Sequence, residues 1–188
     1  GQSDNAFTPL QLATYVSTIA NNGIRLNTHL VSHVESYDGS KVVYENNINN
    51  PEIVQKTGIS DSNMHTLKKA MREVVTSGTA KSIFGDYEIK IAAKTGTAEN
   101  SGSDHTTFIC YAPYDKPEIA IAVVLEHGAK GKYSMSVAKD IMDEYFKITV
   151  IDTRYVNSSL LGNLVDFHGQ DTLFIYSTMI LNNSMSLR

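Results

Sequence analysis

The sequence has 188 residues, 41% of them hydrophobic and 19% charged, which is typical of a one-domain globular protein and excludes intrinsic disorder. The formal net charge of −4 excludes the basic surface of a nucleic-acid-binding protein, and the single cysteine excludes an internal disulfide. No apolar run is long enough to span a membrane, and the chain begins without a signal peptide or an initiator methionine, which suggests a fragment or a processed chain.

The first predicted element is a helix over residues 9–22. Thr8 is a suitable N-cap, and Gln11 completes a Thr-x-x-Gln capping box. Apolar residues recur every three or four positions, and Gly23 is a natural stop.

A β-hairpin over residues 29–45 follows, because Asp38-Gly39 lies between two β-rich runs. We expect a polar loop over residues 46–60. A second helix is predicted over residues 61–77, where apolar side chains recur on one face.

Three strand-like runs come next, over residues 88–93, 106–111 and 118–126. The segments that join them are rich in turn-forming residues, so we expect an antiparallel meander. A third helix over residues 134–146 completes a main domain that we place at residues 1–147. The expected class is therefore α+β.

The last segment, residues 148–188, has a different composition, with no lysine and no glutamate. Its apolar run over residues 172–181 is too short to span a bilayer. Two alternatives stay open. The segment is either a loosely attached extension whose apolar run packs on the main domain, or a β-prone stretch that favours association.

The candidate functional residues are Lys94, Thr95, Gly96 and Thr97, which follow the strand-like run 88–93. A Lys-Thr-Gly triplet at a strand end is typical of serine acyl-transferases that process penicillin-like substrates. The lysine ammonium supplies positive charge for a substrate carboxylate, and the two threonine hydroxyls can hydrogen-bond to it. The glycine lets the ligand lie against the strand, and the backbone N–H of Thr97 offers one oxyanion-hole donor.

Further blocks make this match more specific. They resemble, in the same order, segments of the class B penicillin-binding proteins, which are peptidoglycan D,D-transpeptidases. The resemblance covers roughly residues 1–147. The blocks lie at residues 1–13, 20–23, 71–80, 93–99, 108–115 and 119–128.

The resemblance implies part of a β-lactamase-like transpeptidase domain, an antiparallel sheet flanked by helices. The family attacks the D-Ala-D-Ala end of a peptidoglycan stem peptide with a serine, forms an acyl-enzyme and passes the acyl group to an amine. β-Lactams imitate the donor. The chemistry implies no metal and no organic cofactor. It also implies an extracytoplasmic location on a bacterial membrane, through an anchor that this chain lacks.

The nucleophile is harder to find, because the family order is Ser-x-x-Lys, Ser-x-Asn, Lys-Thr-Gly. Ser136 and Lys139 match the Ser-x-x-Lys string, but they follow the Lys-Thr-Gly triplet in the sequence instead of preceding it. We expect Lys139 on a solvated helix face beside Asp143, where it stays charged and cannot act as a base. The Ser-Asp-Asn string at residues 3–5 lies in a block that follows the family's second motif.

We therefore expect the serine, its lysine and the second motif in a missing N-terminal part of the same domain. The chain is predicted to supply the Lys-Thr-Gly substrate site of a peptidoglycan transpeptidase and to be inactive alone. One alternative is a β-lactamase or β-lactam-sensor domain, which shares the strand motif. Another is a non-catalytic module that docks a partner through residues 148–188.

Three other features are weaker candidates. His29 and His33 lie on one side of a strand, but without a third ligand nearby we expect a solvated pair rather than a metal site. His105 resembles a family histidine, and it either lines the donor groove or caps a loop. Cys110 is predicted to be a buried strand thiol.

Overall fold

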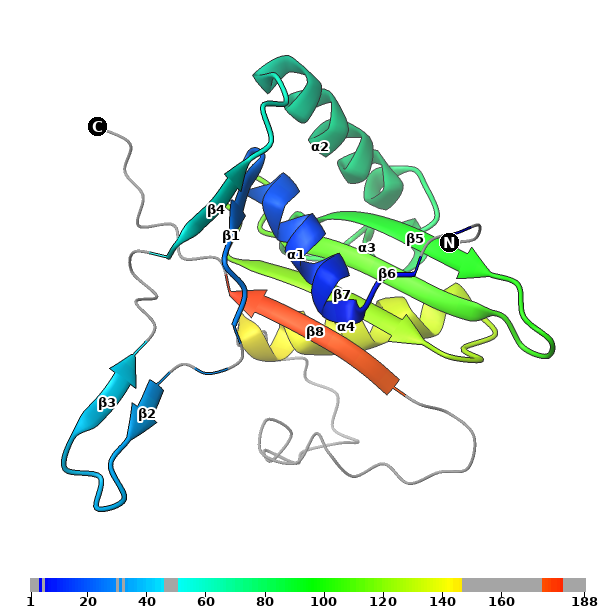
Figure 1. Ribbon diagram of the computed structural model, residues 1–188. Helices are drawn as coiled ribbons and strands as arrows, with labels where there is room; N and C mark the ends of the chain where they lie inside the picture. The colour runs from blue at the N-terminus through cyan, green and yellow to red at the C-terminus, as the bar shows by residue number, and fades with distance from the viewer. Residues whose placement is uncertain are drawn as a thin grey trace.

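A four-stranded antiparallel sheet forms the centre of the protein, in the strand order β5-β6-β7-β8 (Figure 1). The computed structural model describes residue 4, residues 6–29, 31, 33–45 and 51–146, and the backbone of residues 174–180. The strands of this sheet are β5 (Ala92–Ala98), β6 (His105–Ala112), β7 (Ile119–Leu125) and β8 (Phe174–Ile180). The predicted meander and the α+β class are confirmed.

Helices cover both faces of the sheet (Figure 1). The helices α1 (Pro9–Ala20) and α2 (Asp61–Thr76) lie on one face, and α4 (Gly131–Tyr145) lies on the other. Phe84, of the short helix α3 (Lys81–Phe84), packs in the same core cluster as α4. Successive strand residues alternate between the two faces. Because both faces are covered, β7 is apolar at every position rather than at every second one.

Helix α1 begins as its sequence predicts. The Thr8 N–H donates to Gln11 Oε1 at 2.8 Å, and the Gln11 N–H donates to Thr8 Oγ1 at 3.2 Å, which closes the capping box. The helix ends at Ala20, two residues before the predicted end. Its buried face packs against β7 and carries, among others, Ala13, Val16 and Ile19.

Three sequence predictions of elements were wrong in part. The strand predicted over residues 88–93 is β5, which begins at Ala92 and runs through the Lys-Thr-Gly triplet. The loop predicted over residues 46–60 contains β4 (Ile53–Lys56), which pairs with an unpredicted strand, β1 (Ile24–Leu26). Helix α4 begins three residues early, and α3 was not predicted. The strand differences depend on pairing between segments distant in sequence, which local propensity does not contain.

The predicted hairpin is confirmed by β2 (His33–Glu35) and β3 (Val42–Glu45), which project away from the sheet (Figure 1). The Asp38 carboxylate accepts hydrogen bonds from the Ser36 hydroxyl and from the hydroxyl and N–H of Ser40. These donors favour the charged form and lower the pKa of Asp38 to about 2.

The apolar run of the C-terminal segment contributes β8, which pairs with β7 in an unbroken register from Ile119↔Ile180 to Leu125↔Phe174. This pairing attaches the run to the main sheet. The division at residues 147 and 148 stays a prediction, and the rest of the segment lies outside the described residues. Of the helices that the structure describes, none has the length and hydrophobicity of a bilayer span.

Candidate functional site

The Lys-Thr-Gly residues lie on β5, the outer strand of the sheet. Within the described residues β5 pairs with β6 on one side only, so its other edge is open. Lys94 pairs with Ile109 and lies on the α1–α2 face, while Thr95 pairs with Phe108 and lies on the α4 face. Thr97 lies on the same face as Thr95. The lysine and the two hydroxyls therefore belong to opposite faces, and a ligand can meet all three only along the open edge.

The backbone groups of β5 alternate between β6 and the open edge. In an antiparallel pair the N–H and C=O of one residue point the same way, and those of the next point the other way. Lys90, before the strand, has its carbonyl facing the β6 side, where it accepts from the Tyr114 N–H at 2.7 Å. The Ile91 carbonyl faces outward and accepts from Arg72 Nη1 at 2.9 Å. Odd-numbered residues, Thr97 included, thus direct their N–H groups to the open edge.

The Lys94 side chain agrees with this alternation. Its Nζ donates to the carbonyl oxygen of the next residue, Thr95, at 2.7 Å. Lys94 is exposed, so the ammonium lies at the outer edge of the sheet and not inside the core. The Lys94 ammonium is thus held by a backbone carbonyl that faces the open edge of β5.

A residue outside the predicted motif also contacts it. The Thr79 hydroxyl, on the connection between α2 and α3, lies 2.9 Å from the Thr95 hydroxyl. The block around Thr79 contributed to the family resemblance, but the sequence indicated no contact with Thr95, because the two residues are sixteen positions apart.

His105, at the start of β6, contacts the turn that follows β7. Its Nδ1 accepts from the His127 N–H at 3.0 Å, and the two ring centroids lie 5.0 Å apart. His127 follows β7 and has a positive φ of 54°. His105 therefore links the start of β6 to the turn after β7, which supports the loop-capping alternative.

The Ser136–Lys139 string does not form a nucleophile and base. The Ser136 hydroxyl donates to the Lys132 carbonyl at 3.0 Å, and Lys139 Nζ lies 2.5 Å from Asp143 Oδ2. The prediction that this helix face is solvated was wrong. The Asp143 side chain is only 13% exposed, and it also accepts a hydrogen bond from the Tyr87 hydroxyl at 2.8 Å. Packing against the Tyr87 ring covers this face, and the Lys139 ammonium pairs with Asp143 rather than with Ser136.

Among the residues that the structure describes, the remaining candidates form no second reactive centre. Ser3 and Asn5, of the second string, lie outside the described residues. His29 and His33 are both exposed, and the residues that the structure describes contain no group of three or more His, Cys, Asp or Glu side chains suited to a metal ion. Half-buried Lys68 donates to the Ala20 carbonyl at the end of α1 at 2.8 Å, and desolvation lowers its pKa.

Cys110 is fully buried in β6, as predicted, and burial raises the pKa of its thiol. We expect no measurable reaction of the native chain with a thiol reagent such as DTNB at pH 8 within minutes. Complete reaction is expected once urea unfolds the chain. Prompt labelling under native conditions would contradict the burial of Cys110.

Comparisons with known proteins agree on one family. The model of the penicillin-binding protein transpeptidase domain matches residues 1–144. Penicillin-binding protein 2A of Bacillus subtilis is 35% identical over 166 residues, which cover 79% of this chain and 23% of the relative. The peptidoglycan D,D-transpeptidase MrdA of Acinetobacter baumannii is 34% identical, with 79% of this chain and 24% of the relative covered.

Solved structures give the same result. The imipenem acyl-enzyme of penicillin-binding protein A from M. tuberculosis matches with a TM-score of 0.66 and 28% identity, over 78% of this chain and 32% of that one. Penicillin-binding protein 2B from Streptococcus pneumoniae matches with a TM-score of 0.64 and 31% identity, over 80% and 26% of the two chains. The chain thus spans about a quarter of the curated relatives' length, and it belongs to the penicillin-binding protein transpeptidase domain family as part of that domain.

Proposed function

We propose that this chain supplies the carboxylate-binding half of a peptidoglycan D,D-transpeptidase site and that the nucleophilic serine lies in another part of the same domain. One observation carries the proposal. In a chain of this family, Lys94 and Thr95 lie on the open edge of β5, where the one hydrogen bond of the lysine ammonium within the described residues goes to a backbone carbonyl.

The geometry supports binding of an extended acyl donor along this edge. Lys94 offers a charge to the donor's terminal carboxylate, and an ammonium–carboxylate hydrogen bond is roughly twice as strong as a neutral one. Thr95 and Thr97 lie on the other face of the same strand, so their hydroxyls can reach a ligand bound along this edge. Gly96, between them, has no side chain to obstruct a ligand that lies against the strand.

The Thr97 N–H supplies the second element of the proposed site. Because it points to the open edge, it can donate to the oxygen of the attacked carbonyl while the carboxylate occupies Lys94. Such a donor acts mainly in the transition state, when negative charge develops on that oxygen. The chain therefore contributes substrate recognition and one oxyanion donor, while the attacking serine and its base come from elsewhere.

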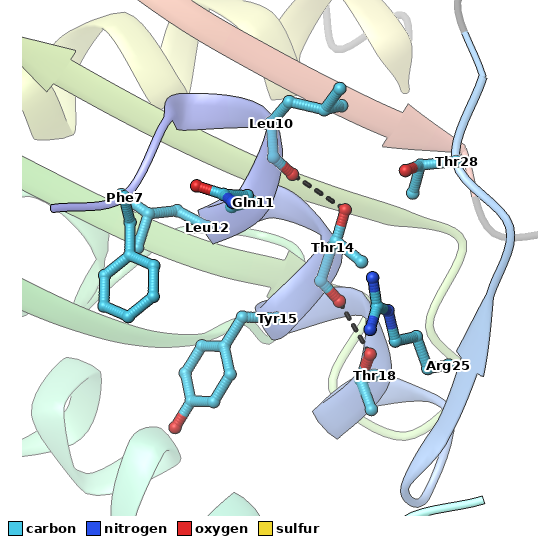
Figure 2. A pocket seen from close by; sticks show the side chains of 9 residues that line it. All are labelled: Phe7, Leu10, Gln11, Leu12, Thr14, Tyr15, Thr18, Arg25 and Thr28. Carbon is cyan, nitrogen blue, oxygen red and sulfur yellow. Dashed lines mark hydrogen bonds between the residues drawn. The ribbon is translucent and has the colours of Figure 1, made fainter. Parts of the chain in front are cut away.

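The rest of the domain is the proposed partner of α1. A groove of about 610 Å³ lies against this helix, and Phe7 and Tyr15 are among the residues that line it (Figure 2). Phe7 is 60% exposed and Tyr15 is 56% exposed, which leaves two aromatic side chains uncovered by the described residues. The remainder of a longer domain would bury them.

The proposed substrates of the complete protein are peptidoglycan stem peptides that end in D-Ala-D-Ala, and β-lactams would acylate the same site. Because the relatives build cell wall, we place this activity on the outer side of the bacterial cytoplasmic membrane. The MrdA relatives are named peptidoglycan D,D-transpeptidases, which favours this reaction over β-lactam hydrolysis.

A chimera tests the proposal directly. Residues 1–144 would replace the matching segment of B. subtilis penicillin-binding protein 2A, and a fluorescent penicillin would report acylation. We expect a covalent signal from the chimera and none from the 188-residue chain. A folded chimera that stays unlabelled, in this recipient and in S. pneumoniae penicillin-binding protein 2B, would contradict the proposal, as would labelling of the isolated chain.

A further inference from the structure

The Thr95 side chain can present either its hydroxyl or its methyl group to the open edge, depending on χ1. A threonine on a strand has few favourable χ1 rotamers, and each directs the hydroxyl differently. In this structure the Thr95 hydroxyl is paired with the Thr79 hydroxyl at 2.9 Å. A methyl group in the place of the Thr95 hydroxyl would lose this contact, so Thr79 favours one rotamer over the others.

Thr79 is itself held firmly by its neighbours. A Cβ on Gly78 would lie 2.8 Å from the Val74 Cα, so only glycine allows the chain to turn so closely at the end of α2. Ala80 is fully buried, and its N–H donates to the Val74 carbonyl at 3.0 Å. The backbone of Thr79 is therefore held in place by the residues on both sides of it.

The same part of the fold is tied to the start of β5. Arg72, on α2, donates from Nη1 to the Ile91 carbonyl at 2.9 Å. Two contacts thus join α2 and its following turn to the outward side of β5, one before the Lys-Thr-Gly triplet and one at its threonine. Together, the Arg72–Ile91 and Thr79–Thr95 contacts set the position of α2 and its following turn along β5, and so the position of the Thr79 hydroxyl beside Thr95.

The direction of the hydrogen bond matters for an anionic ligand. A carboxylate only accepts hydrogen bonds, so Thr95 must donate its single hydroxyl hydrogen to bind one. Its oxygen is then free to accept from Thr79, and a chain of two hydroxyls that donate in sequence strengthens each bond. Without Thr79, the Thr95 hydroxyl loses both its orientation and this donor.

We propose that Thr79 is a positioning residue, which directs the Thr95 hydroxyl so that it donates to a carboxylate at the open edge of β5. The positioning of Thr95 stands on the geometry alone, whereas the carboxylate rests on the proposed function. Thr79 does not touch the ligand. It acts only through Thr95.

The first test measures the Thr95 rotamer in the isotopically labelled 188-residue chain, through NMR three-bond couplings from its Cγ2 to the backbone nitrogen and carbonyl carbon. We expect one dominant χ1 rotamer in the unsubstituted chain and in Thr79→Ser, but averaged couplings in Thr79→Val. The matched control is Thr66→Val, on the exposed side of α2, where the hydroxyl donates only to the Ser62 carbonyl at 2.9 Å. This control should leave the Thr95 couplings unchanged.

Unchanged couplings in Thr79→Val would overturn the proposal. Collapse of its amide spectrum while Thr79→Ser stays folded would also overturn it, because the role of Thr79 would then be structural. The chimera adds a functional measurement: Thr79→Val should slow penicillin acylation about threefold to tenfold, the effect of one hydrogen bond, and Thr79→Ser should restore it. If the unsubstituted chimera is not acylated, the proposed function fails, but the couplings still decide the role of Thr79.

Discussion

Lys94→Ala in the chimera should slow acylation by the fluorescent penicillin by two to three orders of magnitude, about the loss seen when one catalytic electrostatic donor is removed. We expect this loss to come from the removed charge alone, because the Lys94 side chain makes few other contacts among the described residues. Lys94 is exposed, and its only described hydrogen bond is to the Thr95 carbonyl, so the substitution removes the ammonium without disturbing the core. The measurement is the second-order rate constant for acylation, with the urea midpoint taken in parallel.

Lys90 provides the matched control for this substitution. It lies four residues before Lys94, and its ammonium is 3.5 Å from the Asp115 carboxylate in an ion pair whose side chains are 66% and 70% exposed. Lys90→Ala should change the acylation rate less than twofold, since exposed ion pairs contribute little. Equal losses in the two variants would show that general positive charge, and not Lys94, attracts the penicillin.

Phe84→Ala should lower the free energy of unfolding of the 188-residue chain by about 3–5 kcal/mol, the range for loss of a buried aromatic side chain. Phe84 is 1% exposed, and its ring stacks on Phe108 of β6 with centroids 5.6 Å apart. The Tyr87 ring meets it edge-on at 5.5 Å. Removal of this ring leaves a cavity between α3 and the sheet.

Urea denaturation followed by circular dichroism measures this loss. Tyr133→Ala, on α4, removes an aromatic ring that is 48% exposed and should cost less than about 1 kcal/mol. Should Phe84→Ala prove too unstable to fold, Phe84→Leu should still show a clear loss of about 1–2 kcal/mol. A loss below 1 kcal/mol in Phe84→Ala would mean that α3 does not anchor this side of the core.

The features predicted best were those set by residues close together in sequence. The Thr8 and Gln11 capping box is complete within one turn, and it fixed the start of α1 correctly. The pairing of β1 with β4 joins Ile24 to Lys56, and no local pattern connects the two. The start of β5 was misplaced for the same reason, since its pairing with β6, and not the composition of residues 88–93, decides where the strand runs.

The sequence identified the residues of the candidate site but not how they are arranged in space. The triplet at Lys94 is visible in the sequence, and so is its match to the family. The sequence could not show that β5 lies at the edge of the sheet, that Lys94 and Thr95 are on opposite faces, or that Thr79 meets Thr95. It also placed Lys139 on a solvated face, because the covering ring of Tyr87 comes from a distant segment.

Mapping the penicillin adduct by mass spectrometry tests the central claim most directly. The chimera would be acylated, digested and searched for the peptide that carries the added mass. We expect one adduct, on a serine of the recipient protein, and none on residues contributed by this chain. An adduct on Ser136 or Ser3 would contradict it, because the chain would then carry its own nucleophile.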